Sequence, residues 1–163
     1  CMHCSLRIKK MSKLGVEEID LQQCNDFWEI DKQCFSDPWS LSDFEYQIKN
    51  PNSKIIGAFV ENKPVGFVNV QCIAGELTVN NIAVLKEFRK QGIGEKLLKA
   101  ALEAFSNADA AFLEVRESNI PAQKLYEKYD FVKVGERKNY YQNPTENALL
   151  MTKIMKTEQY NEL

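Results

Sequence analysis

The chain has 163 residues, of which 44% are hydrophobic and 27% are charged, and its formal net charge is −2. This length and composition are typical of a single globular domain with a substantial core. The mildly acidic balance argues against nonspecific nucleic-acid binding, which needs a basic surface. No apolar run reaches the length of a transmembrane helix or a signal-peptide core, so we expect a cytoplasmic protein without a membrane partner.

The cysteines do not form a recognisable metal or disulfide pattern. Cys1 and Cys4 flank His3 in a C-x-x-C spacing, but a zinc site needs a second close pair of ligands, and the sequence has none. We therefore expect no metal. Residues 1–13 precede the main folding pattern and are expected to be a leader, either disordered or added for expression. A single domain at 14–156 and a C-terminal tail at 157–163 complete the expected organisation.

Hydrophobic periodicity predicts alternating strands and helices. Short connections make the three central strands an antiparallel meander, and a helical crossover should place the next strand parallel to the last of them. A loop at 140–146 is expected between the final two strands. In chain order the expected elements are a strand at 16–20, helices at 22–35 and 40–50, strands at 54–61, 64–73 and 76–84, a helix at 93–105, a strand at 110–115, a helix at 121–129, and strands at 131–139 and 147–155.

A strand, a glycine-containing loop and an amphipathic helix follow one another between residues 77 and 102. Arg89, Gly92 and Gly94 fit the spacing R-x-x-G-x-G directly before the helix. Glycine lets the backbone approach a ligand and adopt positive φ, and a helix start offers unpaired N–H groups and partial positive charge. The motif predicts a phosphate site, although an ordinary turn before a core helix can have the same spacing. The loop lacks the third glycine of a Rossmann fingerprint and the Gly-Lys-Ser/Thr of a P-loop.

Three other side chains are candidates for chemistry or binding, each with a structural alternative. Glu114 interrupts an apolar strand, where a carboxylate is costly unless it is functional or is paired with Arg116 or another cation. Tyr126 lies on an apolar helix face, as either a core aromatic or a phenol that donates a proton. Trp39, at the break between two helices, is either a core plug or the wall of a binding groove.

The element order and four short stretches resemble the GNAT superfamily of acyl-CoA-dependent N-acetyltransferases and, within it, the RimI branch. The four stretches are Phe35-Ser36-Asp37-Pro38-Trp39-Ser40, Asn81-Ile82-Ala83-Val84, Leu113-Glu114-Val115-Arg116-Glu117-Ser118-Asn119 and Asn139-Tyr140-Tyr141. This resemblance, over about 16–155, implies a mixed α/β fold. Its sheet is mostly antiparallel, is splayed between the fourth and fifth strands, and carries helices on both faces. The chain departs from the family pattern at Asp130, where glycine is usual, and at Glu95, where a basic residue is common.

RimI-type enzymes transfer an acetyl group from acetyl-CoA to the N-terminal amine of a protein, notably a small-subunit ribosomal protein. The resemblance implies acetyl-CoA as cosubstrate, an N-terminal peptide as partner and no metal. It also implies that Glu114 accepts a proton and that Tyr126 donates one. The implied CoA contacts are Ile82, Ala83, Val84, Arg89, Lys90, Gln91, Gly92, Ile93, Gly94, Glu95 and Asn119. The implied peptide contacts are Trp39, Tyr140 and Tyr141. For Asn119 the alternative role is a turn or helix cap.

Two other functions stay open from the sequence. One is a GNAT enzyme acting on a small amine, such as a polyamine or an aminoglycoside. The other is a non-catalytic module that binds acyl-CoA. Retention of both Glu114 and Tyr126 argues against the non-catalytic module. The loops that carry Trp39 and the pair Tyr140 and Tyr141 argue, more weakly, against the small amine.

Overall fold

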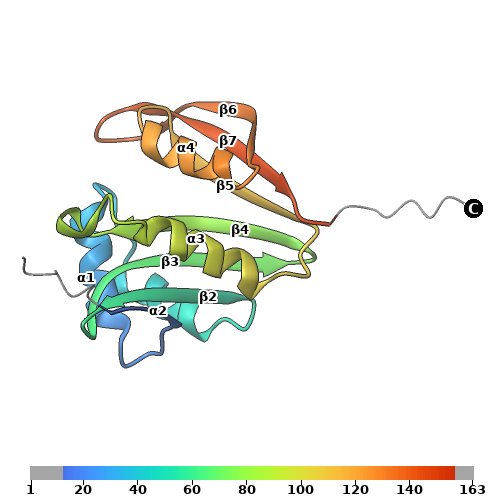
Figure 1. The fold of residues 1–163 in the computed structure, drawn as a ribbon. Helices are drawn as coiled ribbons and strands as arrows, with labels where there is room; N and C mark the ends of the chain where they lie inside the picture. The colour runs from blue at the N-terminus through green and yellow to red at the C-terminus, as the bar shows by residue number, and fades with distance from the viewer. Residues whose placement is uncertain (1–12, 157–163) are drawn as a thin grey trace, which may run out of the picture.

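The computed structural model describes residues 13–156; the expected tail and all but the last residue of the expected leader lie outside the described residues. The described strands are β1 (Leu14–Glu18), β2 (Ser53–Val60), β3 (Lys63–Ile73), β4 (Glu76–Val84), β5 (Ala110–Arg116), β6 (Val132–Tyr141) and β7 (Glu146–Ile154). The described helices are α1 (Cys24–Cys34), α2 (Leu41–Lys49), the short 3-10 helix η1 (Lys86–Phe88), α3 (Ile93–Ala104) and α4 (Ile120–Lys128). The strands form one sheet in the order β1-β2-β3-β4-β5-β7-β6 (Figure 1), and only the β4–β5 pair is parallel.

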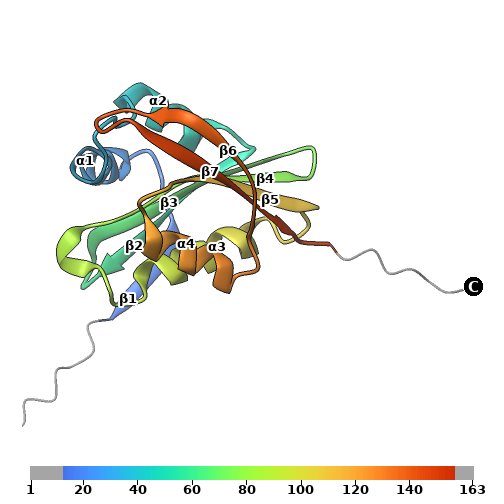
Figure 2. The same ribbon diagram turned by 90° about the horizontal axis from the view of Figure 1, so that it is seen from above.

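Two α-helices cover each face of the sheet. Figure 2 shows α1 and α2 on one side of the strands and α3 and α4 on the other. On the first face, Phe27 of α1 and Phe44 of α2 contact Phe67 of β3 edge to face, with ring centroids 6.5 and 5.3 Å apart. All three rings are fully buried. Aromatic clusters of this kind bury a large apolar area and favour offset geometries, so they fix the position of both helices.

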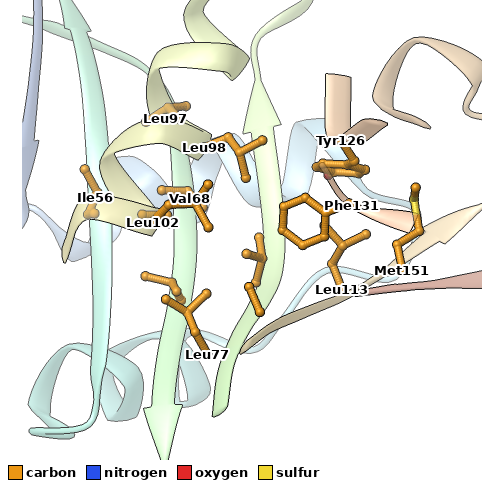
Figure 3. Close-up of a cluster of buried hydrophobic side chains, with 14 of the residues drawn as sticks. Ile56, Val68, Leu77, Leu97, Leu98, Leu102, Leu113, Tyr126, Phe131 and Met151 are labelled. Atoms are coloured by element: carbon orange, nitrogen blue, oxygen red, sulfur yellow. The ribbon is translucent and has the colours of Figure 1, made fainter. Parts of the chain in front are cut away.

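The second face carries the larger core. The apolar stripe predicted for α3 faces the sheet, and Leu97 and Leu98 are fully buried there. Burial of each such leucine contributes about 1.5–3 kcal/mol. Tyr126 of α4 joins the same cluster beside Phe131 and Met151 (Figure 3). The prediction of a mixed, mostly antiparallel sheet with helices on both faces is therefore confirmed.

The sheet opens between β4 and β5. Their parallel pairing runs only from Glu76 to Val79 on β4. At the next residue, Asn80, the β3–β4 register shifts, so that Asn69 faces Asn81 and Val70 faces Val79. A bulge bends its strand and increases the local twist, which turns the rest of β4 away from β5. Strand β5 continues to Arg116 with β7 as its partner. The predicted splay between the fourth and fifth strands is confirmed.

The predicted helix start at Ser40 and helix exit at Asp130 are confirmed, whereas the loop predicted at 140–146 is wrong. Ser40 caps α2 by accepting from the amide of Asp43 at 3.1 Å, and Asp130 leaves α4 with a left-handed φ of 67°. The expected loop at 140–146 is shorter, because β6 continues through Tyr141, which faces Glu146 of β7. An irregularity between Arg137 and Tyr141 lets the strand resume its pairing. The tyrosine pair therefore belongs to a strand end.

A glycine substitution tests the packing that supports the open strand. A Cβ at Gly66 of β3 would lie 2.6 Å from the backbone oxygen of Ala83 on β4, and backbone cannot yield as a flexible side chain can. We expect Gly66→Ala to lower the free energy of unfolding by about 1–3 kcal/mol in urea titrations. Gly15→Ala is the matched control in β1, where a Cβ meets nothing within 4 Å, and it should change stability by less than about 0.5 kcal/mol. Equal effects of the two substitutions would contradict the close β3–β4 contact.

Candidate active site

The glycine loop leads directly into the first turn of α3. Gly92 occupies the N-cap position with a φ of 79°, and Lys90 also has a positive φ of 62°. No side chain caps the helix, and the first helical bond runs from the Lys96 amide to the Gly92 oxygen at 3.1 Å. The amides of the first turn therefore have no partner within the helix and point along its axis. Residues 89–92 are exposed, so an anion can reach these amides.

Arg89 braces this loop against the end of β4. Its Nε donates to the carbonyl of Val84 at 2.9 Å. Its Nη2 lies 4.0 Å from the sulfur of Cys34 in α1. Arg89 thus satisfies a backbone group on the open edge of β4 and also contacts α1.

Glu95 is paired with groups of α4. Its Oε1 accepts from Lys128 Nζ at 2.6 Å and from the Tyr129 hydroxyl at 3.0 Å. The hydrogen bond from Lys128 is the largest influence that lowers the pKa of Glu95, followed by the bond from Tyr129. The departure from the family pattern at this position therefore joins α3 to α4, and the carboxylate does not stand unpaired beside the anion loop.

The end of β4 presents unpaired backbone groups to the opening. The amide of Leu85 donates to the carbonyl of Val65, and antiparallel bonding alternates along a strand. The backbone groups of Ala83 therefore face Phe67 of β3, whereas those of Ile82 and Val84 face the opening. Since Arg89 occupies the Val84 carbonyl, both backbone groups of Ile82 and the amide of Val84 can pair with an extended ligand. Ala83, which the sequence grouped with them, cannot pair in this way.

Glu114 lies on β5 across from these groups. Its side chain is 30% exposed and its Oε1 is 3.4 Å from Arg137 Nε on β6. The alternative partner that the sequence offered, Arg116, pairs with Glu146 at 3.1 Å. A hydrogen bond with Glu114 is the main cause of the raised pKa of the Tyr140 phenol. The carboxylate therefore contacts one cation and one phenol and stays partly exposed.

Tyr126 is buried in the core that α4 shares with the sheet. Its ring packs on Phe131 with centroids 5.9 Å apart. Burial, with a smaller effect from Tyr141, raises the pKa of Tyr126 to about 12. The pKa of Tyr141 is also about 12, owing first to burial and then to the charge of Glu114. Both phenols therefore keep their protons at neutral pH.

Arg116 holds the β6–β7 turn beside the tyrosine pair. It donates to the carbonyls of Gln142 and Pro144 at 3.0 and 3.1 Å, and its guanidinium stacks 4.5 Å above the ring of Tyr141. Tyr140 packs edge to face on Tyr141 at 5.1 Å and is 47% exposed. One cation thus orders the turn and fixes the ring of Tyr141, while the ring of Tyr140 is free to contact a ligand.

Trp39 is half-buried, as expected for a side chain that contributes to the core. It packs against the α1–α2 core and also lines a surface hollow of about 460 Å³. Its amide donates to Asp31 Oδ2 at 2.8 Å, and its carbonyl accepts from Trp28 Nε1 at 2.9 Å. Asn119 adopts its structural alternative, since its Oδ1 caps α4 by accepting from the Ala122 amide at 3.2 Å.

Three segments that carry predicted site residues lie at one end of the molecule. In Figures 1 and 2 the η1 loop, the α1–α2 connection and the β6–β7 turn all lie at that end. Sequence reasoning missed Asp31, Arg137 and the role of Arg116. An acid adjoining Ile30 on the buried face of α1 was the available signal for Asp31. Among residues 13–156 no group of metal-ligating side chains could hold an ion, and no described helix is long and apolar enough to cross a membrane.

These features define an acetyltransferase of the GNAT class. The chain belongs to the GNAT acetyltransferase family, whose family model matches residues 24–131. The ribosomal protein bS18-alanine N-acetyltransferase of Haemophilus ducreyi is 33% identical over 143 residues, which cover 83% of this chain and 97% of that one. The crystal structure of the Escherichia coli ribosomal-protein-S18-alanine N-acetyltransferase superposes with a TM-score of 0.84 at 24% identity, covering 93% of this chain and 99% of that one. The crystal structure of Arabidopsis thaliana NAA60 in complex with acetyl-CoA superposes with a TM-score of 0.80 at 15% identity, covering 88% of this chain and 99% of that one.

A charge placed in the loop tests the anion site. A Cβ at Gly92 meets nothing within 4 Å, so a larger side chain fits there at the cost of its left-handed φ. We expect Gly92→Glu to raise the Kd for CoA by roughly tenfold or more, because a carboxylate would occupy the helix start. Gly92→Asn carries no charge and tolerates the left-handed region, and it should weaken binding much less. Calorimetric titration of both variants measures the difference, and unchanged affinity in Gly92→Glu would refute the assignment.

Proposed function

We propose that this protein transfers the acetyl group of acetyl-CoA to the N-terminal α-amine of a protein, and that the substrate is a ribosomal protein. The observation that carries the proposal is the open edge of β4, which lies across the splay from β5, the strand that carries Glu114. Membership of the GNAT family and the activities named for its relatives support it. A ribosomal substrate would place the protein in the cytoplasm.

Acetyl-CoA fits the groups along the opening. The amides at the start of α3 receive the pyrophosphate, and the backbone of Ile82 and the amide of Val84 pair with the pantetheine arm. Those groups are available because β4 has left β5 by this point. An amide on this edge also polarises the thioester carbonyl by donating to its oxygen. The side-chain amide of Asn119 remains available to CoA, since its capping bond uses Oδ1.

Glu114 accepts the proton of the attacking amine. The amine nitrogen forms a bond to the acetyl carbon, the carbon–sulfur bond breaks, and the amine proton passes to the carboxylate directly or through one water. An α-amino group has a pKa of about 7.7–8.0, against about 10.4 for lysine, so a modest base suffices for an N-terminus. Arg137 and Tyr140 hold Glu114 in place for this role.

Tyr126 stabilises the departing thiolate. A phenol with a pKa of about 12 is fully protonated at neutral pH and donates a hydrogen bond to sulfur. An ordinary thiol has a pKa of about 8.5, so the phenol gives up its proton only as another proton replaces it. Tyr126 therefore acts as a hydrogen-bond donor to the thiolate, which takes its proton from water, while Glu114 returns the proton of the amine to water.

The peptide lies between two walls on opposite sides of the opening. Trp39 is anchored to the β4 side through Asp31, and Tyr140 and Tyr141 extend from the β5–β7 side. Contacts on both sides hold the first residues of a peptide and direct its amine toward Glu114. A small amine has no side chains to reach both walls. We therefore propose a protein substrate instead of a small amine.

Substitution of the two catalytic candidates tests the chemistry. We expect Glu114→Gln to lower kcat on an N-terminal peptide at neutral pH by about 10²–10⁴-fold, because the amide cannot accept the proton. Tyr126→Phe should also lower kcat while acetyl-CoA affinity is largely retained. Glu136→Gln is a matched control that removes an ion-paired carboxylate from β6, where Glu136 contacts Lys133 at 2.7 Å. Near-wild-type rates in both catalytic variants at saturating substrate would remove these roles.

Removal of the wall aromatics tests the substrate class. Because Trp39 is held by its backbone, Trp39→Ala removes the ring and leaves both of its backbone hydrogen bonds possible. We expect Trp39→Ala and Tyr140→Ala each to lower kcat/KM for a matched peptide by about tenfold or more, about 1.4 kcal/mol, with little change in acetyl-CoA affinity. Thermal unfolding of the same variants shows whether lost stability accounts for the effect. Efficient wild-type turnover of spermidine with negligible peptide turnover would overturn the protein substrate while leaving the GNAT assignment intact.

A further inference from the structure

The carboxylate of Asp31 is fully buried beneath the connection between α1 and α2. Among residues 13–156 no lysine or arginine pairs with it; the groups that stabilise its charged form are the Trp39 amide and the Asn81 side chain. A buried carboxylate without a cation is costly unless hydrogen bonds compensate. The two hydrogen-bond partners of Asp31 offset part of this cost, and their positions suggest a role for the carboxylate.

The two partners of Asp31 belong to different parts of the site. Oδ2 accepts from the backbone amide of Trp39 at 2.8 Å, in the segment proposed to contact the peptide. Oδ1 accepts from Asn81 Nδ2 at 3.1 Å, on β4 directly before Ile82. The Asp31 carboxylate on α1 therefore contacts two parts of the proposed site. One is the segment around Trp39, which we call the peptide wall, and the other is the strand proposed to bind CoA.

The β4 end of this connection lies at the opening of the sheet. Asn80 is the bulged residue after which β4 leaves β5, and its side chain donates to Asn69 Oδ1 at 3.4 Å. Asn81 faces Asn69 across the β3–β4 pair. Asparagine side chains thus line the bulge on the α1 face, and Asp31 is the group that joins this polar cluster to the peptide wall.

We propose that Asp31 is a positioning residue that fixes Trp39 relative to the CoA-binding edge of β4, and so sets the distance between the bound peptide and the acetyl group. This inference rests on the proposed function. It adds a residue that touches neither substrate and acts through the hydrogen bonds of its two partners. Loss of the connection frees the peptide wall and leaves the anion loop intact.

The structure offers a conservative replacement that keeps the connection. The Oδ1 of Asn81 is buried and has no hydrogen-bond partner within 13–156. With Asp31→Asn, the new oxygen can still accept from the Trp39 amide. A rotated Asn81 side chain can then accept from the new NH₂ group through its Oδ1. Asp31→Asn should therefore preserve the geometry that Asp31→Ala destroys.

The test compares Asp31→Ala and Asp31→Asn with Ile30→Ala. Ile30 is a buried neighbour on α1 whose truncation weakens the same core without touching the connection. We expect Asp31→Ala to raise the peptide KM by about tenfold or more, while the Kd for acetyl-CoA changes by less than about threefold. Asp31→Asn and Ile30→Ala should both keep a peptide KM close to that of the wild type.

A second readout does not depend on turnover. Hydrogen exchange of the Trp39 amide, followed by NMR in the protein without substrates, should be slow in the wild type and in Asp31→Asn, and fast in Asp31→Ala. If the wild type fails to acetylate any peptide, the proposed function fails, and the exchange result still decides whether Asp31 holds Trp39.

Three results would overturn the inference: unchanged Trp39 exchange in Asp31→Ala, equal peptide KM effects in Asp31→Ala and Ile30→Ala, or equal impairment in Asp31→Asn and Asp31→Ala.

Should Asp31→Ala fail to fold, Asn81→Ala replaces it. That substitution severs only the β4 side, so Trp39 exchange should stay slow while the peptide KM rises. An unchanged peptide KM in Asn81→Ala would likewise overturn the inference.

Discussion

The parting of β4 from β5 is the constraint on which the rest of this structure depends. Four residue pairs hold the two strands together, and the bulge at Asn80 then turns β4 away while β7 retains β5. Backbone groups exposed at such an edge must find partners. Arg89 provides one for the Val84 carbonyl. The remaining groups face the opening, where we propose that an extended ligand pairs with them, so the same break in pairing creates both the edge and the space beside it.

The opening lies between β4 and the later strands, although one apolar core continues from α3 to Tyr126 and Met151 beneath it. Helix α3 packs on β1–β4, whereas α4 is tied to β7 by Lys153, whose Nζ donates to the Tyr129 carbonyl at 2.8 Å. Glu95 on α3 accepts from Lys128 and Tyr129, so it adds a polar connection to the short strand pairing and the shared core. A residue that the sequence marks as a departure from the family pattern therefore contributes to the geometry of the site.

Charge within the opening is arranged around one carboxylate. Glu114 raises the pKa of Tyr140 by hydrogen bonding and contributes to that of Tyr141, while burial raises the pKa of Tyr126. Raised phenol pKa values keep all three hydroxyls protonated across the neutral range. This part of the molecule therefore offers one accessible acceptor and several protonated phenols, and this combination suits the proposed reaction, in which a proton leaves an amine and negative charge develops on sulfur.

The sequence by itself determined the features that depend on local geometry. Hydrophobic periods gave the order of elements, the serine–aspartate pair at Ser40 gave the start of α2, and the glycine spacing gave the left-handed residue before α3. It also singled out Glu114, because a carboxylate in an apolar strand is conspicuous within a few residues, whereas Tyr126 was chosen through the family resemblance. These signals can be read from a short segment because φ preferences and side-chain periodicity act over one or two turns.

Only the tertiary structure decided which groups meet across the chain. It paired Glu114 with Arg137 instead of Arg116, continued β6 through the tyrosine pair, and buried Asp31 between Trp39 and Asn81. Each of these contacts joins residues from separate elements, and several cations or acceptors of the sequence could have served equally well. The choice among them follows from the strand register and from the opening of the sheet, which no local pattern encodes.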